Sequence, residues 1–430
     1  MLSKLLSLCL LVCYLVFVPV TAQAGITNFS KFVTAEYWQT NNKNGNDVIM
    51  DKFQVADFNR KICTVSPTVV DLASYPKTVS GVSIKAKISN YEVLNDDLYL
   101  HGNRVSDNYK NIIRTQTNVD AIPSEVKVQY AVTVRRCNLR NLPTGEGLFH
   151  FPSDQDFDIL QETTIDPAEP IAVFHTSTNG YFYYVQTVNY IGWVSKYDIA
   201  FTDKNTWMQY VSPKRFLVVT GKNITIKTSG EIVEYQQGAK LPLEGEQSDT
   251  YFATAPVRGK NGKLSKVRVL VKKNPANLYV GYLPYTSNNL IAAAFKFYDT
   301  PYGWGGLKSG VDCSSLIYNV YRTVGIYLPH NADEQETSSG IHYSFAGLGS
   351  EKRDEIIKNL KPGACLFMDG HVAMYLGQSG DMPYIIHSLG SYYEGGQRHR
   401  PMKVVVSDLN LNRSSGLSFL ESFTNAVEFR

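Results

Sequence analysis

The sequence predicts an α+β protein of several domains, and three observations support this fold class. Short strand-like runs separated by turn signals fill residues 126–205 and again residues 206–285. Helix-like and strand-like runs then alternate from residue 286 to residue 430. A more polar stretch, residues 25–125, comes first and is typical of helix and loop. A chain of 430 residues that is 43% apolar can bury several cores, so we expect two to four domains.

The charge balance excludes one class of partner. The formal net charge is +3, and no block of lysine or arginine resembles those that follow a nucleic-acid backbone. We therefore expect no nucleic-acid partner. The sequence also lacks a Cys/His cluster at zinc spacing, so we expect no metal and no other cofactor.

The first residues, 1–24, have the pattern of a secretory signal peptide. Lys4 precedes an apolar run from Leu5 to Val20, and residues 22–24 supply a small-x-small cleavage site. The alternative is a membrane anchor, but a run of sixteen residues is short for a helix that spans a bilayer, which takes about 20. We expect cleavage near Ala24 and a periplasmic or secreted chain without stable membrane insertion.

Four cysteines remain after such a cleavage. They are Cys63, Cys137, Cys313 and Cys365. If one of them acts as a nucleophile, at most one disulfide can form, and Cys63 with Cys137 is the only pair that we consider. Cys365 lies in the apolar run "CLFM" and is expected to be inert packing.

The two strand-rich segments resemble each other in texture. Each has several short strand-like runs and ends in an aromatic-x-glycine-aromatic motif, at residues 190–193 and 279–282. Such runs are typical of small closed β-barrels. The sequence therefore predicts two tandem barrels of about 80 residues each.

Cys313 is expected at the start of a helix. Apolar residues recur at helical spacing after it, and Gly325 followed by Pro329 ends the pattern. Asp312 occupies the position of an N-cap. Free backbone N–H groups and the helix dipole favour an anion in a first turn. We therefore expect the pKa of the Cys313 thiol to lie below the ~8.5 of a free cysteine.

Two histidines follow in strand-like runs, His371 in "HVAMYLG" and His387 in "YIIHSLG". In the first run the apolar residues occupy alternate positions, so they lie on the face of the strand opposite to His371. If the face that carries His371 packs on the start of the helix, His371 contacts Cys313. His371 would then take the thiol proton and later protonate the leaving amine, while His387 would fix its tautomer. The backbone N–H of Cys313 is a candidate oxyanion donor.

Each of these residues also has a structural interpretation. A lone cysteine in an apolar helix is usually a small buried hydrophobe, and a lone histidine in a strand is usually a core residue. The glycine-rich entry, the cap and the order of the two histidines together favour a catalytic site. We interpret the other six histidines as structural or surface residues: His101, His150, His175, His330, His342 and His399.

The runs "PYGWGG", "DCSSLIYNVYR", "GHVAMYLG" and "YIIHS" resemble the NlpC/P60 family of papain-like cysteine peptidases, which cut the stem peptides of bacterial peptidoglycan. The resemblance covers about residues 286–400. It implies a papain-like catalytic domain at residues 286–430. Upstream, the first strand-rich segment resembles the SH3-like domain of one branch of this family, and residues 25–125 resemble the N-terminal domain of that branch.

The resemblance implies site residues. Cys313, His371 and His387 would form a Cys-His-His triad, and the Tyr302 hydroxyl would help to hold the oxyanion. The residues beside the nucleophile, Asp312 and Ser314, would help to bind the free amine of an N-terminal L-Ala.

Two positions depart from the pattern of the family. Ala364 stands where an aspartate is often found, and His330 stands where an arginine often follows the proline. Neither belongs to the triad, so they bear on substrate detail only.

The acidic run "SDQDFDILQE" of the first predicted barrel supplies three further candidates, Asp156, Asp158 and Glu162. If this barrel packs beside the cleft, one of them would bind the same ammonium, and the enzyme would accept only peptides with a free amine. The alternative is that all three lie in a solvated turn.

The function expected from these observations is a cell-wall hydrolase, a cysteine endopeptidase that cleaves the γ-D-Glu to diamino acid bond of stem peptides with a free N-terminal L-Ala. One alternative is an N-acetylmuramoyl-L-alanine amidase or acyltransferase of the same fold. Another is a wall-binding protein with a silent peptidase domain, which the intact triad argues against. The sequence leaves open whether intact wall or released peptide is the substrate, which diamino acid is preferred, the oligomeric state and the envelope type.

Overall fold

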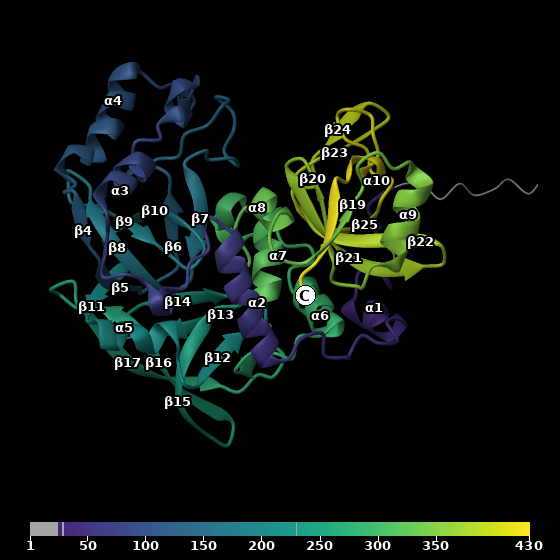
Figure 1. Cartoon of the computed structure of the whole chain (residues 1–430), viewed down its shortest axis with the longest axis horizontal. Helices are drawn as coiled ribbons and strands as arrows, with labels where there is room; N and C mark the ends of the chain where they lie inside the picture. Colours follow the sequence, from purple (N-terminus) through teal and green to yellow (C-terminus); the bar gives the residue numbers. More distant parts are fainter. Residues whose placement is uncertain (1–24, 28–29, 229) are drawn as a thin grey trace, which may run out of the picture.

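The computed structural model describes residues 25–27, 30–228 and 230–430, so the predicted signal peptide lies outside the described residues. Figure 1 shows two halves: a strand-rich half topped by α3 and α4, and a half that contains the last third of the chain together with α1. No helix of the described part is long and apolar enough to cross a bilayer. The mixture of helices and antiparallel sheets confirms the predicted α+β class.

The first β unit is a seven-stranded antiparallel sheet in the order β11-β5-β8-β9-β10-β6-β7. Ile165 on one edge strand and Ile199 on the other lie in the same buried cluster, so the sheet curves around its core. The strands are β5 (Gln129–Thr133), β6 (Cys137–Arg140), β7 (Gln161–Ile165), β8 (Pro170–Thr176), β9 (Phe182–Gln186), β10 (Ile191–Ser195) and β11 (Ile199–Thr202).

The second β unit has a five-stranded sheet in the order β17-β16-β15-β12-β18 and a separate hairpin, β13-β14. Trp207 of α5 is fully buried in its core. The elements are α5 (Lys204–Val211), β12 (Phe216–Val219), β13 (Asn223–Lys227), β14 (Ile232–Gln236), β15 (Lys240–Gln247), β16 (Thr250–Arg258), β17 (Leu264–Lys272) and β18 (Leu278–Val280). That this unit is SH3-like stays a prediction.

The glycine of the repeated aromatic-x-glycine-aromatic motif is required for a different reason in each of the two β units. Gly192 lies inside β10, where an added Cβ would come within 2.5 Å of the Leu139 side chain. Gly281 follows β18 and has a φ of +79°, a conformation that favours glycine. The shared motif is therefore no proof of a structural repeat.

The stretch before the first β unit is spread over both halves. Residues 30–70 pack into the core of the C-terminal unit, where Trp38 and Ile62 are buried. Leu72 packs in the cluster around Trp207 of the second β unit, and residues 79–128 pack on the first β unit, where Ile84 of α3 contacts the cluster around Trp193. The helices are α1 (Ala35–Asn41), α2 (Lys52–Val65), α3 (Gly81–Ile88) and α4 (Asp107–Gln116), and the short strands are β1 (Thr78–Ser80), β2 (Tyr99–Leu100), β3 (Asn103–Arg104) and β4 (Glu125–Lys127). The predicted domain boundaries stay a prediction.

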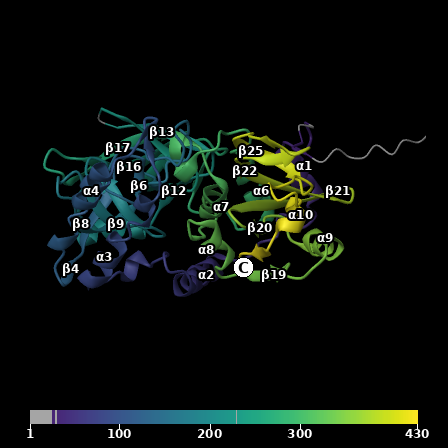
Figure 2. The same cartoon turned by 90° about the horizontal axis from the view of Figure 1, so that it is seen from above.

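The C-terminal unit, residues 286–430, is a six-stranded antiparallel sheet in the order β19-β26-β20-β21-β22-β25 between two helical layers. Helices α6 and α7 share a core with one face, and α9 and α10 share a core with the other. Figure 2 shows α7 on the side that faces the rest of the chain. The elements are α6 (Ser287–Phe295), α7 (Cys313–Arg322), α8 (Ala332–Glu336), β19 (Ile341–Ser344), α9 (Ser350–Asn359), β20 (Cys365–Met368), β21 (His371–Ser379), β22 (Met382–Leu389), β23 (Tyr392–Glu394), β24 (Gln397–His399), β25 (Lys403–Asp408), α10 (Phe419–Ser422) and β26 (Asn425–Glu428).

The four cysteines of the described residues are all free. The pairing considered for Cys63 and Cys137 is therefore wrong: Cys137 is buried in the first β unit, and Cys63 lies on α2 against the C-terminal unit. Cys365 is fully buried in a strand, which confirms its expected role as packing.

A buried charge network joins the two halves. Asp166 accepts hydrogen bonds from Arg136 at 2.7 Å and from Arg322 of α7 at 2.9 Å. It also accepts the backbone N–H of Gln236 from the second β unit at 3.0 Å. Asp166, which is 2% exposed, thus holds groups from three parts of the chain.

We expect Asp166→Ala to lower the free energy of unfolding by about 3–5 kcal/mol, because it leaves the Arg136 guanidinium without its carboxylate and leaves the buried Arg322 with Glu169 alone. Chemical denaturation monitored by circular dichroism measures this change. Asp97→Ala, which breaks the exposed pair with Arg104, is the control and should change stability little. Equal effects of the two variants would contradict a role for the network.

Candidate active site

Cys313 begins α7, and the sequence around it explains why the helix starts there. Asp312 is the N-cap: its side chain accepts the backbone N–H of Ser315 at 2.8 Å. The Ser315 hydroxyl accepts the backbone N–H of Asp312 at 2.9 Å, which completes a capping box. The predicted helix and its cap are confirmed, and the Cys313 side chain lies in the first turn.

The glycine-rich entry lets the first β unit reach this helix start. Gly305 and Gly306 have φ values of +52° and +78°. An added Cβ would come within 2.7 Å of the Gln161 side chain at Gly305 and within 2.1 Å of Thr164 at Gly306. Gly305 donates its N–H to Asp312 at 2.8 Å, and its carbonyl accepts from Gln161 at 3.0 Å. Larger residues here would push strand β7 away from Cys313.

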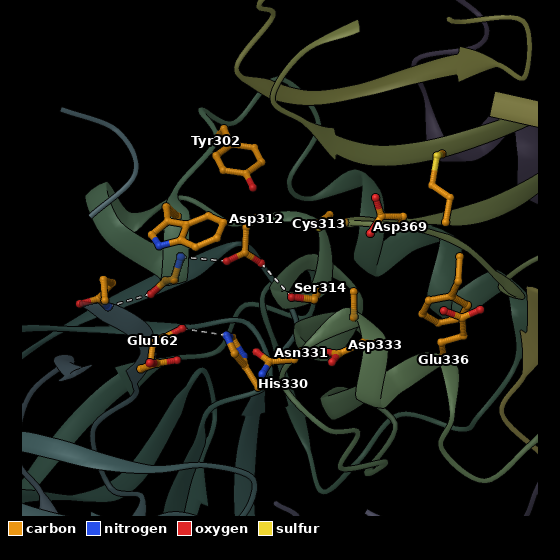
Figure 3. Close-up of a pocket in the computed structure, with 17 residues that line it drawn as sticks. Glu162, Tyr302, Asp312, Cys313, Ser314, His330, Asn331, Asp333, Glu336 and Asp369 are labelled. Atoms are coloured by element: carbon orange, nitrogen blue, oxygen red, sulfur yellow. Dashed lines mark hydrogen bonds between the residues drawn. The ribbon is translucent and has the colours of Figure 1, made fainter. Parts of the chain in front are cut away.

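Cys313 lies in the wall of a cavity of about 500 Å³ between β7 and the turn that joins β20 to β21. Figure 3 shows the Tyr302 hydroxyl directed toward the Asp312–Cys313 step. An adjoining hollow of about 240 Å³ is lined by His371. The two hollows share Tyr302 and the turn residues 368–370, so Cys313 and His371 lie along one depression.

The two histidines are joined by hydrogen bonds that define which ring nitrogens carry protons. His371 Nε2 lies 2.8 Å from His387 Nδ1, and His387 Nε2 lies 3.1 Å from the Ser407 hydroxyl. The Ser407 hydroxyl donates its single proton to the carbonyl of Asp408 at 2.9 Å. It therefore accepts from His387 Nε2–H, whose Nδ1 in turn accepts from His371 Nε2–H. This order leaves a lone pair on His371 Nδ1, which can accept a proton.

Burial keeps these groups uncharged. Burial and the charge of Arg413 lower the pKa of His371 to about 4, and burial lowers the pKa of His387 well below its usual range. Burial and the Asp312 carboxylate raise the pKa of Cys313 to about 12, although the backbone N–H groups of Val372 and Ser314 act in the other direction. The expectation of a lowered thiol pKa is therefore wrong, because burial and Asp312 outweigh the helix start.

The expected route by which His371 approaches Cys313 is also wrong. Val372 and Met374 lie on the face of β21 opposite to His371, and they pack with the apolar side of α7. Ala373, which shares the face of His371, packs in the core on the far side of the sheet. At the start of the strand, the backbone N–H of Val372 lowers the pKa of the Cys313 thiol. The residue that follows His371 thus connects the strand to the nucleophile.

Only one of the three acidic candidates of the first β unit lies in the cavity. Glu162 lines it, and its carboxylate accepts from Asn141 at 2.9 Å and from the Tyr190 hydroxyl. Asp158 is 5% exposed and is held by Arg140 at 2.8 Å, away from the residues that line the cavity. Asp156 pairs with Lys308 at 2.9 Å and does not line the cavity either, so a role of these two residues in binding substrate stays a prediction.

The cavity contains further residues that the sequence did not single out. His330, which was interpreted as structural or surface, is 3% exposed, contacts the Glu162 carbonyl at 3.1 Å through Nε2 and also lines the cavity. Three more carboxylates line the same cavity together with Asp312, Ser314 and Glu162: Asp333, Glu336 and Asp369. The described residues hold no group of three or more His, Cys, Asp or Glu placed to bind a metal.

Comparisons with known proteins agree with this geometry. Residues 299–394 match the NlpC/P60 family, and residues 148–195 match an SH3 domain of the SH3b1 type. An NlpC/P60 endopeptidase from Photobacterium damselae subsp. piscicida has the same fold, with a TM-score of 0.75 at 18% identity over 92% of this chain and 96% of that chain. These matches place Cys313, His371 and His387 inside the matched family region.

Two named relatives align over about half of this chain. A dipeptidyl-peptidase 6 of Lysinibacillus sphaericus is 26% identical over 51% of this chain and 78% of its own length. A gamma-D-glutamyl-L-lysine dipeptidyl-peptidase of Bacillus subtilis is 27% identical over 49% of this chain and 60% of its own length.

The fold and the site define a cysteine peptidase. More particularly, the chain carries an NlpC/P60 domain preceded by an SH3 domain.

We expect the acid limb of kcat/KM to lie close to pH 4, well below the ~6.5 of an unperturbed histidine. His371 must be neutral to accept the thiol proton, and its pKa is lowered to about 4, so activity should be lost only as the pH falls through that value. Initial rates from pH 3.5 to 8 on a stem peptide measure this limb. A limb near pH 6.5 would contradict it.

We expect Ser407→Ala to lower kcat about tenfold with little change in KM, since about 1.4 kcal/mol of hydrogen bonding no longer fixes the tautomer of His387. Ser407→Thr keeps the hydroxyl and should restore the rate. A purely structural role would instead lower stability and leave kcat per folded molecule unchanged, as thermal unfolding of both variants would show.

Proposed function

We propose that this protein is an extracytoplasmic peptidoglycan hydrolase that cleaves the γ-D-Glu to diamino acid amide of stem peptides. The observation that carries the proposal is the placement of Cys313 and His371 along one depression whose walls are rich in carboxylates. The relatives named for γ-D-glutamyl-L-lysine cleavage support the choice of bond. The signal-peptide pattern of residues 1–24 supports the location.

Cleavage begins with a proton transfer between uncharged groups. His371 Nδ1 accepts the Cys313 thiol proton as the sulfur attacks the carbonyl carbon of the γ-glutamyl amide. The oxyanion that forms is stabilised by the backbone N–H of Cys313 and by the Tyr302 hydroxyl. Burial raises the pKa of Tyr302, so this hydroxyl keeps its proton at neutral pH and can donate it.

Breakdown of the intermediate returns the proton. The imidazolium of His371 protonates the departing amine of the diamino acid, the C–N bond breaks, and a thioester to Cys313 remains. A water then gives a proton to His371 as its oxygen attacks the thioester, and the sulfur leaves and recovers that proton. His387 and Ser407 hold the ring of His371 through both steps.

The first β unit supplies the wall that meets the amino end of the substrate. Glu162 and Asp312 line the cavity on this side, with Ser314 beside the nucleophile. A free N-terminal ammonium of L-Ala would make charge-assisted hydrogen bonds with these carboxylates. A glycan strand attached at that nitrogen would remove the charge and would need space that the first β unit fills.

We expect Cys313→Ala to lower hydrolysis by at least about 1,000-fold, because it removes the nucleophile. His371→Ala should be nearly as damaging, whereas His387→Ala should cost less, since water can replace part of its orienting role. Mass spectrometry of products from L-Ala-γ-D-Glu-diaminopimelate measures the loss. Turnover by a folded alanine variant at position 313 would contradict the mechanism.

We expect acetylation of the L-Ala amine to lower kcat/KM about 10- to 100-fold, the value of one or two charge-assisted hydrogen bonds. Glu162→Gln should lower the preference for the free amine while keeping the contacts to Asn141 and Tyr190. Asp312→Asn is a less suitable test, because both oxygens of Asp312 accept backbone N–H groups, from Gly305 and from Ser315. The amide NH2 of asparagine would face one of these two donors and disturb the site.

The matched control for the amine is Asp156→Asn, which removes a carboxylate of the same β unit that lies outside the cavity. It should keep the full preference. If the wild-type enzyme has equal kcat/KM for the free and acetylated peptides, the proposed recognition of the amine is wrong. The proposed chemistry at Cys313 does not depend on this result.

A further inference from the structure

A second cavity, of about 710 Å³, lies where α2 meets the two β units. Its walls are largely apolar and include Val69, Leu72, Val188 and Val211. Figure 1 shows α2 crossing between the two halves beside this place. None of its lining residues lines the cavity of Cys313. Cavities of this size at domain junctions are typical of small-molecule sites.

One wall of this cavity carries a buried cation. Lys240, the first residue of β15, is 8% exposed and lines the cavity. Among the described residues, no carboxylate lies within ion-pair distance of its ammonium, which lies 5.4 Å from the ring centre of Tyr327. A buried charge costs free energy unless it is paired, and a cation–π contact offsets only part of that cost.

The other charges of the wall already have partners. Glu169 accepts from Arg322 at 2.8 Å. Asp71 accepts the backbone N–H of Ala73 at 2.9 Å, and Arg60 pairs with Asp57 on the exposed side of α2. Among the described residues of this wall, Lys240 is therefore the buried charge without an ion pair, whereas the Asp71 side chain is exposed to solvent.

Two tyrosines add a hydrogen-bond donor beside Lys240. The hydroxyls of Tyr282 and Tyr327 lie 2.7 Å apart, and both residues line the cavity. Burial raises the pKa of both, so both keep their protons at neutral pH. One hydroxyl can donate to the other, which leaves one proton for a ligand oxygen.

We propose that this cavity binds a small carboxylate with an apolar body, whose carboxylate pairs with Lys240 and accepts from the tyrosine pair while its apolar part lies against the valine and leucine side chains. Charge complementarity selects the carboxylate, and the apolar walls select the body. The site is separate from the peptide cleft and does not depend on the proposed reaction.

The test is isothermal titration calorimetry with octanoate and with octanamide, which has the same chain without the charge. We expect octanoate to bind the wild-type chain with one saturable site and Lys240→Met to weaken it at least about tenfold, the value of one charge-assisted hydrogen bond. Octanamide should bind the wild type and Lys240→Met alike. Lys272→Met, which removes an exposed lysine of β17 outside this cavity, should match the wild type. No saturable octanoate binding to the wild type, or equal affinity in Lys240→Met, would overturn the proposal.

A second measurement uses only the wild-type chain and covers the case in which Lys240→Met fails to fold. Cys63 lines the same cavity and is half-buried. Octanoate at ten times its Kd should slow alkylation of Cys63 by N-ethylmaleimide about tenfold, since about one molecule in eleven is then unliganded. Labelling of Cys313, followed in the same digest by mass spectrometry, should be unchanged. Unslowed labelling of Cys63 would overturn the proposal.

Discussion

The carboxylate of Asp312 is the group on which the site depends. One oxygen caps the helix that carries Cys313, and the other accepts the N–H of Gly305. The carbonyl of Gly305 then accepts from Gln161 of β7. One side chain therefore sets the start of α7, holds the glycine turn and ties the first β unit to the cavity. Its charge also raises the pKa of the neighbouring thiol, so the same group that orders the site keeps the thiol protonated.

The protonated thiol of Cys313 determines what the histidines must do. A thiol that keeps its proton needs a base in the same depression, and a buried imidazole supplies one only while it is neutral. Burial and the charge of Arg413 keep His371 neutral, and the chain from Asp408 through Ser407 and His387 leaves its free lone pair on Nδ1. The thiol and the imidazole therefore become charged only when the sulfur attacks, and the oxyanion donors then act on a newly formed charge.

The sequence predicted the features that consecutive residues form, and it missed those that depend on residues far apart in the chain. The helix at Cys313, its cap and the two histidine strands were predicted because each is written in consecutive residues. Ser407 was missed because it reaches His387 only through the register of β22 on β25, and its one signal was a lone serine ending an apolar run. Asp158 and Glu162 are four residues apart in one acidic run, and the run does not reveal that Arg140 and the backbone N–H of Leu148 hold Asp158 in the interior while Glu162 lines the cavity. The thiol pKa was mispredicted because burial cannot be derived from a helix position.

The position of the first β unit follows from the buried network rather than from surface contacts. Asp166 pairs with Arg322 of α7, nine residues after the nucleophile, and with Arg136 of the first β unit. Separating the two halves would break both ion pairs of Arg322, with Asp166 and with Glu169. The wall that carries Glu162 is therefore fixed relative to Cys313 before any peptide enters. Selectivity for the amino end of a substrate would then arise from a preformed wall, whose carboxylates lose no conformational freedom when the ammonium binds.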